Sequence, residues 1–161
     1  MKIKLLKCLF IALSIFFFAS KSYGQQLDLN FINISSKDGL SSNLVNAILK
    51  DKYGFMWFGT DDGLNKFDGE RFTVYRHKVE DSESISSNEI LYLYEDEKAN
   101  LWIGTGSGLV LYDRNTDTFK NISLTKDFTV TSVCSFNNNI WVAHYSGLVV
   151  YNYENNTVTN L

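Results

Sequence analysis

The chain has 161 residues, of which 45% are hydrophobic, 15% aromatic and 20% charged, with ten glycines, two cysteines and no proline. This composition is typical of one globular domain and excludes a disordered or collagen-like chain. The formal net charge of −3 gives no basic stripe that could neutralise phosphates, so nucleic acid is not an expected partner. Without proline, the turns must come from Gly, Asn, Asp and Ser, which favours β-hairpins.

The first 24 residues have the pattern of an export signal. Three lysines (Lys2, Lys4 and Lys7) precede an apolar run over residues 8–19, and small residues follow at Ser22 and Gly24. This order predicts a signal peptide over residues 1–24 with cleavage after Gly24. The alternative is an uncleaved membrane anchor, but the apolar run is short for a membrane span. Cys8 lies before the run, whereas a lipoprotein cysteine would follow it.

The mature chain is more acidic and has one cysteine. Removing residues 1–24 takes away four lysines and no acidic residue, so the net charge changes from −3 to −7. Cys134 then remains alone, which excludes an internal disulfide, and the domain must be held together by packing or by a neighbouring chain. Cys134 lies in the apolar stretch 130–136 and is expected to be a buried, inert thiol. No membrane span is expected in the mature chain.

Internal repeats organise the remainder of the chain. The segments 57–64, 102–109 and 141–148 each begin with Trp and end with Gly-Leu, at spacings of 45 and 39 residues. A Ser-Ser-Asn motif upstream recurs at the same spacing of 45, at residues 41–43 and 86–88. A period of about 40–50 residues is typical of propeller blades and of some helical solenoids.

Each repeat predicts four short β-strands. The segments are rich in β-branched and aromatic residues and none shows a sustained helical period, which disfavours a helical solenoid. The predicted fold is therefore an all-β propeller with three four-stranded blades in an incomplete ring. The blades cover about residues 43–76, 88–122 and 128–161. The predicted strands are 45–51, 55–60, 64–68, 71–76, 90–96, 101–105, 109–113, 118–122, 130–135, 140–144, 148–152 and 157–161.

Two repeated positions have a structural interpretation. The glycines that end the turns between the second and third strands should adopt positive φ, as tight hairpins require; they are Gly63, Gly108 and Gly147. The tryptophans share one register, where a flat ring can fill the wedge between blades; they are Trp57, Trp102 and Trp141. The alternative for the tryptophans is a stacking platform for a sugar or a base.

One further strand is predicted outside the three blades. Residues 29–34 resemble the outer strands at 72–75 and 119–122. A lone outer strand at the start of a propeller completes the last blade and fastens the ring.

The motifs at residues 38–43, 51–60 and 63–69 together resemble the two-component regulator propeller family. This family forms the periplasmic sensor region of hybrid two-component system histidine kinases of Bacteroidetes. The resemblance implies consecutive seven-bladed propellers, a β-sandwich, a membrane helix, a kinase, a receiver and an AraC-type DNA-binding domain, and it implies sensing of oligosaccharides. This chain departs from the pattern, since it holds three units and no kinase motif, and Ala143-His144 replaces Gly-Thr in the third.

Three blades cannot close a ring, so aromatic residues at both ends would stay exposed. We therefore expect an N-terminal fragment whose stability depends on missing blades or on a second propeller chain. The function that follows is a periplasmic ligand-sensing module. The alternatives are a nonsignalling interaction or vestigial propeller fragment, and, more weakly, a secreted lyase or hydrolase.

Polar and aromatic residues vary on the repeated turns between second and third strands, which is how repeat proteins build recognition surfaces. The predicted ligand contacts are Asp61, Asp62, Ser107, His144 and Tyr145, with an oligosaccharide as the ligand. The two histidines, His77 and His144, have no metal-ligand spacing, and Asp51, Asp61 and Asp62 are interpreted as turn carboxylates. No catalytic residue, metal or cofactor is expected.

Overall fold

Short β runs separated by tight turns build the part of the chain that the structure, a computed structural model, describes: residues 30–160. That part contains no α-helix and two single turns of 3-10 helix, η1 (Ser36–Asp38) and η2 (Ser123–Thr125). From residue 34 onward the chain packs as one unit. The predicted signal peptide lies outside the described residues.

The first blade is an antiparallel sheet with its strands in chain order. The turn after β1 closes when the Asp51 amide donates to the Phe55 carbonyl over 2.9 Å. Gly63 has a φ of +133°, so the expected left-handed backbone is confirmed at this position. The strands of blade 1 are β1 (Val45–Lys50), β2 (Met56–Thr60), β3 (Gly63–Phe67) and β4 (Phe72–Tyr75).

The second blade repeats the first in register. Trp57 lies opposite Lys66 in blade 1, and Trp102 lies opposite Leu111 in blade 2. Gly108 again has positive φ, at +107°. The strands of blade 2 are β5 (Ile90–Glu95), β6 (Leu101–Thr105), β7 (Gly108–Asp113) and β8 (Thr118–Asn121).

The third blade differs at its first hairpin. Phe136 pairs with Asn139, and the two residues between them, Asn137 and Asn138, have φ of +50° and +59°. Two consecutive left-handed residues are typical of a type I′ turn, for which Asn is well suited. Gly147 keeps the positive φ of the other blades, at +151°. The strands of blade 3 are β9 (Val130–Phe136), β10 (Asn139–His144), β11 (Gly147–Asn152) and β12 (Thr157–Asn160).

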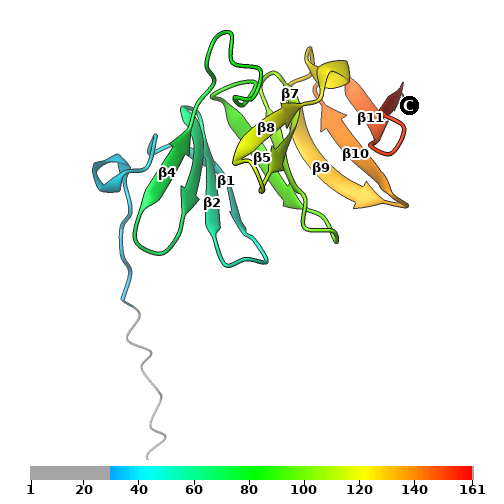
Figure 1. Cartoon of the computed structure of the whole chain (residues 1–161). Coiled ribbons are helices and arrows are strands. Elements are labelled where there is room, and N and C mark those ends of the chain that lie inside the picture. Colours follow the sequence, from blue (N-terminus) through cyan, green and yellow to red (C-terminus); the bar gives the residue numbers. More distant parts are fainter. Residues whose placement is uncertain (1–29, 161) are drawn as a thin grey trace, which may run out of the picture. The chain divides into compact units, whose positions relative to one another are not determined.

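The three sheets stand side by side in chain order and do not close a ring (Figure 1). The prediction of an all-β propeller with three four-stranded blades is therefore confirmed. The first strands of neighbouring blades touch, β1 with β5 and β5 with β9. One apolar core fills the space between blades 1 and 2, around Trp57, and a second fills the space between blades 2 and 3, around Trp102.

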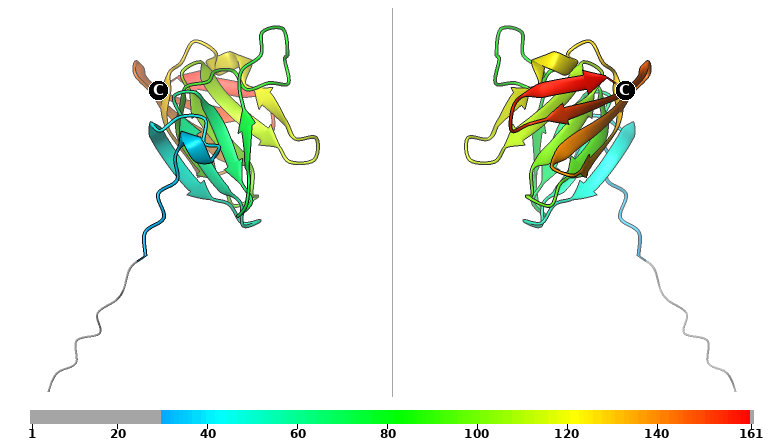
Figure 2. Two further views of the ribbon diagram at one scale, coloured as in Figure 1. Left: turned by 90° about the vertical axis from the view of Figure 1, so that its left-hand side faces the viewer. Right: turned by 90° about the vertical axis from the view of Figure 1, so that its right-hand side faces the viewer.

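The third tryptophan departs from the prediction. Trp57 and Trp102 are fully buried between blades, as expected, but Trp141 is only half-buried. Ile140 and Val142 on either side of it point into the core around Trp102, so Trp141 lies on the side of blade 3 that faces away from blade 2. No further blade of the described chain stands on that side (Figure 2, right). The packing role therefore holds for two of the three positions.

Two other expectations are wrong. Cys134 is exposed, because it pairs across the sheet with Trp141 and so lies on the same open side of blade 3. The outer strand expected over residues 29–34 is not formed by the described residues 30–34, which have no strand pairing. A strand needs a hydrogen-bonded neighbour, and a closing strand finds one only when the ring brings a last blade beside it.

Candidate functional site

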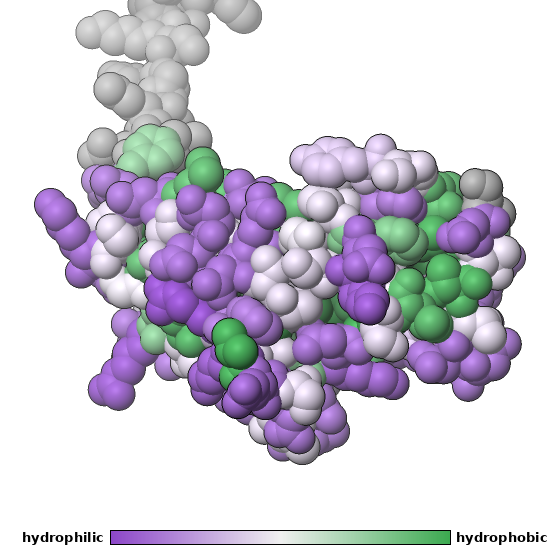
Figure 3. All heavy atoms as spheres, turned by 90° about the horizontal axis from the view of Figure 1, so that it is seen from above, coloured by the Kyte–Doolittle hydropathy of each residue, from purple (hydrophilic) through white to green (hydrophobic). Residues whose placement is uncertain are grey.

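The turns between second and third strands lie on the same side of the blades as the connections between blades. We call this side the loop face; it carries the β2–β3, β6–β7 and β10–β11 turns and the connections 76–89 and 122–129. Seen from above, hydrophilic side chains predominate over the blade 1 end of the loop face, and hydrophobic ones gather towards blade 3 (Figure 3).

A cleft of about 430 Å³ opens on the loop face. One wall is the connection between blades 1 and 2, and the other is the end of β8 with η2. We call it the loop-face cleft. It is lined by His77, Lys78, Glu80, Asp81, Ser82, Ser86, Ser107, Leu109, Asn121, Ile122, Ser123 and Lys126.

Hydrogen bonds fix the wall that the connection 76–89 contributes. The His77 amide donates to Asn88 Oδ1 over 2.7 Å, and the His77 ring Nδ1 lies 2.9 Å from the Ile85 carbonyl oxygen. Ile85 is fully buried in the core between blades 1 and 2. The Lys78 amide donates to Ser84 Oγ over 3.0 Å. A long connection is thus held in a defined conformation, which is what a preformed binding wall requires.

Asn121 joins the two walls of the cleft. Its Nδ2 donates to the Ser84 carbonyl over 2.9 Å and, more weakly, to the Ser82 carbonyl over 3.4 Å. These bonds fix the amide orientation, so Oδ1 is the free end. Asn121 Oδ1 is buried and has no hydrogen-bond donor among the described residues. A buried acceptor without a donor costs free energy of about 1–3 kcal/mol, and such a group in a cleft indicates a place for a ligand donor.

The cleft is polar at its rim and apolar at its floor. Leu109 and Ile122 are buried beneath it, and serine hydroxyls from both blades reach it. Two lysines and two acidic residues stand around the opening, so neither sign of charge predominates. Such a site suits a neutral, hydroxyl-rich molecule with one apolar face.

The five predicted ligand contacts all come from the loop-face turns, but the structure does not bring them together. Ser107 lines the loop-face cleft. Asp62 forms an ion pair of 2.9 Å with Arg76, and Asp61 is exposed on the same turn. His144 stacks on Phe128, with ring centroids 4.1 Å apart, beside a separate hollow of about 210 Å³.

Tyr145 completes the five; its side chain is 80% exposed and it lies on the turn after His144. The predicted residues therefore mark three separate places on one face, one for each blade. Ligand contact by each of them stays a prediction.

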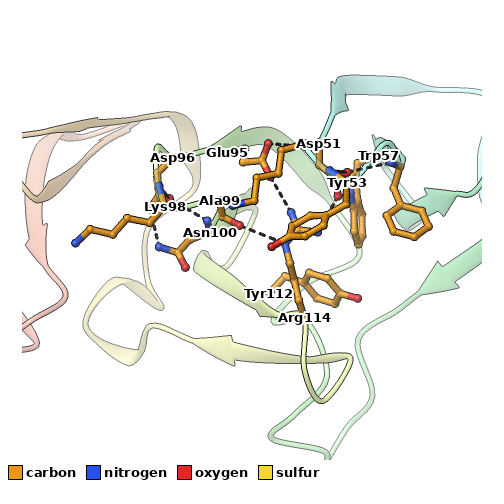
Figure 4. A network of polar contacts seen from close by, with 12 residues as sticks. Asp51, Tyr53, Trp57, Glu95, Asp96, Lys98, Ala99, Asn100, Tyr112 and Arg114 are labelled. Atoms are coloured by element: carbon orange, nitrogen blue, oxygen red, sulfur yellow. Dashed lines mark hydrogen bonds and ion pairs between the residues drawn. The ribbon is translucent and has the colours of Figure 1, made fainter.

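On the opposite side, a polar network joins blades 1 and 2 where β1 and β5 end (Figure 4). Trp57 Nε1 donates to Asp51 Oδ2 over 2.8 Å, and Arg114 donates to the same oxygen over 2.7 Å. Arg114 also donates to Glu95 over 3.0 Å and lies above the Tyr53 ring. We call this the Asp51 joint. Its side chains make contacts within the protein, which indicates a structural role.

The Asp51 joint shifts the acid–base equilibria of its members. Burial raises the pKa of Asp51, but hydrogen bonds from Trp57, Arg114 and the Phe55 amide outweigh it and hold the pKa below the ordinary value of 3.8. Burial and a hydrogen bond to Asp117 raise the pKa of Tyr112 to about 12. Both shifts arise from burial and from hydrogen bonds within the protein, which is typical of a structural contact.

Sequence reasoning missed two features, and a signal in the sequence could have identified one of them. The spacing Asp-x5-Trp occurs at Asp51 and again at Asp96, whose carboxylate accepts from Trp102 Nε1 over 2.9 Å. That repetition marks each Asp as the partner of the indole. The cleft residue Asn121 has no such signal, because it becomes special only through the fold of the connection opposite it.

Two features are absent from residues 30–160. No group of three or more His, Cys, Asp or Glu side chains there could hold a metal ion. No helix in that part of the chain is long and apolar enough to cross a membrane.

Comparison with known proteins shows what the chain resembles. The family described as two component regulator propeller matches residues 39–62. Histidine kinase P4 of Formosa agariphila is 46% identical over 66 residues, which cover 41% of this chain and 5% of that kinase. The matched region is thus a small part of a much longer relative.

Solved structures of extracellular domains from two-component systems are also similar to this chain. The extracellular domain of the putative hybrid two component system BT3049 of B. thetaiotaomicron has a TM-score of 0.72 and 31% identity, and the match covers 81% of this chain and 20% of that domain. The extracellular domain of BT4673 from the same organism gives 0.64 at 23% identity, covering 76% and 18% of the two chains.

A virginiamycin B lyase from Staphylococcus aureus gives a TM-score of 0.55 at 11% identity, covering 71% of this chain and 40% of the lyase. At that level of identity the likeness shows the propeller fold alone. The chain therefore spans about a fifth of the first two sensor domains and resembles them throughout its blades. These matches confirm that the chain resembles the two component regulator propeller family, in the form found in the extracellular domains of hybrid two-component systems.

Proposed function

We propose that this chain is a ligand-sensing propeller module of a two-component system, exported by the signal peptide over residues 1–24 to the periplasm, and that its ligand is an oligosaccharide. The resemblance to sensor propellers supports the class of function. The observation that carries the ligand proposal is Asn121 Oδ1, a buried acceptor without a donor in the wall of the loop-face cleft.

An oligosaccharide meets the chemistry of the cleft. Its hydroxyl groups donate to amide and serine oxygens and accept from lysines, while the C–H face of a sugar ring covers apolar side chains such as Leu109. Because one wall is the connection between blades 1 and 2 and the other is the end of blade 2 with η2, occupancy of the cleft favours one placement of that connection against blade 2 over others. Kinase and output domains elsewhere in the system would convert that preference into a signal.

Binding measurements on the exported chain test this proposal. We expect a member of a panel of neutral and acidic oligosaccharides to give saturable heat in calorimetric titration. The substitution Ser107→Leu places a bulky apolar side chain in the cleft and should weaken binding at least about tenfold, or about 1.4 kcal/mol.

Tyr145→Ala is the matched control, since it changes an exposed side chain on the same face outside the cleft. Binding that disappears with Tyr145→Ala and survives Ser107→Leu would move the site to the turn of blade 3. A panel that gives no binding at all would contradict the oligosaccharide proposal.

A further inference from the structure

A second hollow lies between blades 1 and 2, at the edge opposite the loop face and beside the Asp51 joint. We call it the Lys66 pocket. Its volume of about 290 Å³ is just below the range of about 300–1,000 Å³ that holds drug-sized ligands, so it suits a smaller molecule. Both walls belong to blades that the structure describes in full. The pocket is lined by Tyr53, Phe55, Lys66, Tyr112, Arg114 and Asn115.

Lys66 departs from the residues at the same place in the other blades. It pairs across the sheet with the buried tryptophan of blade 1, and the residues in that register position in blades 2 and 3 are Leu111 and Val150. A charged side chain therefore stands where both other repeats have an apolar one. The repeat does not require this lysine, so its presence needs an explanation specific to this pocket.

Other lining residues also differ between repeats. Tyr53 follows the Asp partner of its tryptophan by two residues, and blade 2 has Lys98 at that place. Arg114 is replaced by Gly69 in blade 1 and by Tyr153 in blade 3. Side chains that vary on a constant frame are the means by which repeat proteins build recognition sites.

Aromatic rings surround the Lys66 ammonium group. Its Nζ lies 4.4 Å from the centre of the Phe55 ring, 5.5 Å from that of Trp57 and 5.6 Å from that of Tyr112. The electron-rich faces of such rings attract a cation. The rings therefore hold the charge at a defined place in the pocket, but they do not neutralise it.

No carboxylate within residues 30–160 balances the charge of Lys66. Its one hydrogen bond there is donated to the Tyr112 hydroxyl over 3.2 Å, and it forms no ion pair. An ammonium group has three N–H donors, so two are left without an acceptor in that part of the chain. Since a half-buried charge is stabilised by an opposite one, this arrangement favours an anion as the occupant.

Arg114 is the second cation of the lining, and its charge is already balanced. It forms ion pairs with Asp51 at 2.7 Å and with Glu95 at 3.0 Å. The Tyr53 and Tyr112 rings stand next to its side chain (Figure 4), with Arg114 Cζ 4.7 Å and 5.8 Å from their centres. The pocket thus offers one unbalanced positive charge among aromatic rings, which matches a singly charged anion that carries an apolar surface.

We propose that the Lys66 pocket binds a small carboxylate attached to a ring, a class that includes aromatic acids and uronic acids. The two remaining N–H groups of Lys66 donate to the two carboxylate oxygens, and the ring of the ligand packs against Tyr53 and Phe55. Phosphate groups carry nearly two charges at neutral pH and fit a single unbalanced cation less well. This site is separate from the loop-face cleft and does not depend on the oligosaccharide proposal.

Calorimetric titration of the exported chain with benzoate, glucuronate and acetate tests the proposal. We expect saturable binding of benzoate or glucuronate, and acetate should bind at least about tenfold more weakly because it lacks a ring. Binding of benzoate alone identifies an aromatic acid, and binding of glucuronate alone identifies a uronic acid. The neutral analogues benzamide and glucose should not bind. The parent chain therefore tests the need for charge without any variant.

Lys66→Leu introduces the residue that blade 2 has at this position, so the blade should keep its fold, as circular dichroism can verify. It should weaken binding of the carboxylate at least about tenfold, or about 1.4 kcal/mol. Lys120→Leu, at an exposed position of β8, is the matched control and should leave binding unchanged. Tyr53→Ala removes a ring that is 59% exposed and should weaken the ring-bearing probe at least about threefold without affecting acetate.

Ser107→Leu separates this proposal from the one for the loop-face cleft, and it should leave carboxylate binding unchanged. Four results would each overturn the Lys66 pocket as a carboxylate site. They are the absence of carboxylate binding, equal affinity for benzoate and benzamide or for a carboxylate and inorganic phosphate, binding that survives Lys66→Leu, and binding that is lost in Ser107→Leu.

Discussion

Blades 2 and 3 have the same four strands and the same pairing register, yet only blade 2 buries its tryptophan. Trp102 is covered by Tyr151 of the next blade and donates to Asp96. Within residues 30–160, Trp141 has neither an aromatic ring packed on it nor a hydrogen-bond acceptor. The comparison shows that two parts of the fold have different causes. The hairpins form from local turn chemistry, whereas burial of each Trp needs a second blade beside it and a longer turn between the first two strands.

The largest effect on stability is expected when each of the two indoles is removed in turn. Trp102→Ala should lower the free energy of unfolding by about 5 kcal/mol, since it empties a filled core and removes the indole that donates to Asp96. Trp141→Ala should cost only about 2 kcal/mol, because that side chain is already partly exposed. Urea denaturation measures both. Equal losses would show that the open face contributes as much as the closed one.

The Asp51 joint gives the next largest effect. Asp51→Ala should cost about 3 kcal/mol, because Trp57 and the partly buried Arg114 lose their shared acceptor. Asp61→Ala, on an exposed turn, is the control and should stay within about 0.5 kcal/mol of the parent chain.

The same joint predicts a pH dependence with a definite sign. The pKa of Asp51 is lower in the folded than in the unfolded chain, so its contribution is complete above the ordinary value of 3.8 and is lost as the pH falls through the folded value. Thermal unfolding between pH 6 and 2 should show this loss in the parent chain. Asp51→Asn should flatten that part of the curve, and an unchanged slope would contradict the assignment.

Turn glycines provide a smaller contrast between the same two blades. A Cβ at Gly108 would lie 2.9 Å from the Thr125 carbonyl oxygen, whereas at Gly147 the first atom met is 4.0 Å away. Both positions have positive φ. Gly108→Ala should therefore cost about 2 kcal/mol or more, and Gly147→Ala about 1 kcal/mol from backbone strain alone. Melting temperatures of the two variants, measured side by side, should rank in that order.

The smallest expected effect is a gain. Phe136 occupies the pairing position that Asp51 and Asp96 have in the other blades, and its side chain is 62% exposed. Phe136→Asp should offer Trp141 Nε1 an acceptor and raise stability by about 1 kcal/mol. Phe136→Ala removes the exposed ring without adding an acceptor and serves as the control. If the two variants are equally stable, the shorter hairpin of blade 3 keeps the carboxylate away from the indole.

The repeat arithmetic and the residue types were enough to predict the blades. The second strand of blade 2 begins at Leu101 and ends at Thr105, as its pattern predicts, because β-branched and aromatic residues between Gly-containing turns leave little choice. The exposure of Cys134 could not be predicted in this way. Alternation assigns it to one face of a strand, but only the arrangement of blades decides whether that face is covered.

The sequence predicted which face of the blades carries the candidate site, but it did not predict most of the residues that line the cleft. The turns that vary between repeats do lie on the loop face, and Ser107 lines the cleft found there. Asn121 and the part of the connection over residues 76–85 carry no repeat signal, since the corresponding connection 122–129 has a different length and contains η2 instead. Periodicity cannot predict the structure of segments that differ in length between repeats.

The Asp51 joint and the loop-face cleft lie at opposite edges of the same pair of blades. The Asp51 joint fixes blades 1 and 2 to each other at one edge. Small rotations of the blades about the Arg114 contact therefore produce their greatest displacement at the opposite edge, on the loop face. If a ligand draws the walls of the cleft together, the Asp51 joint acts as a hinge and the angle between the blades changes. A neighbouring domain could detect that change of angle.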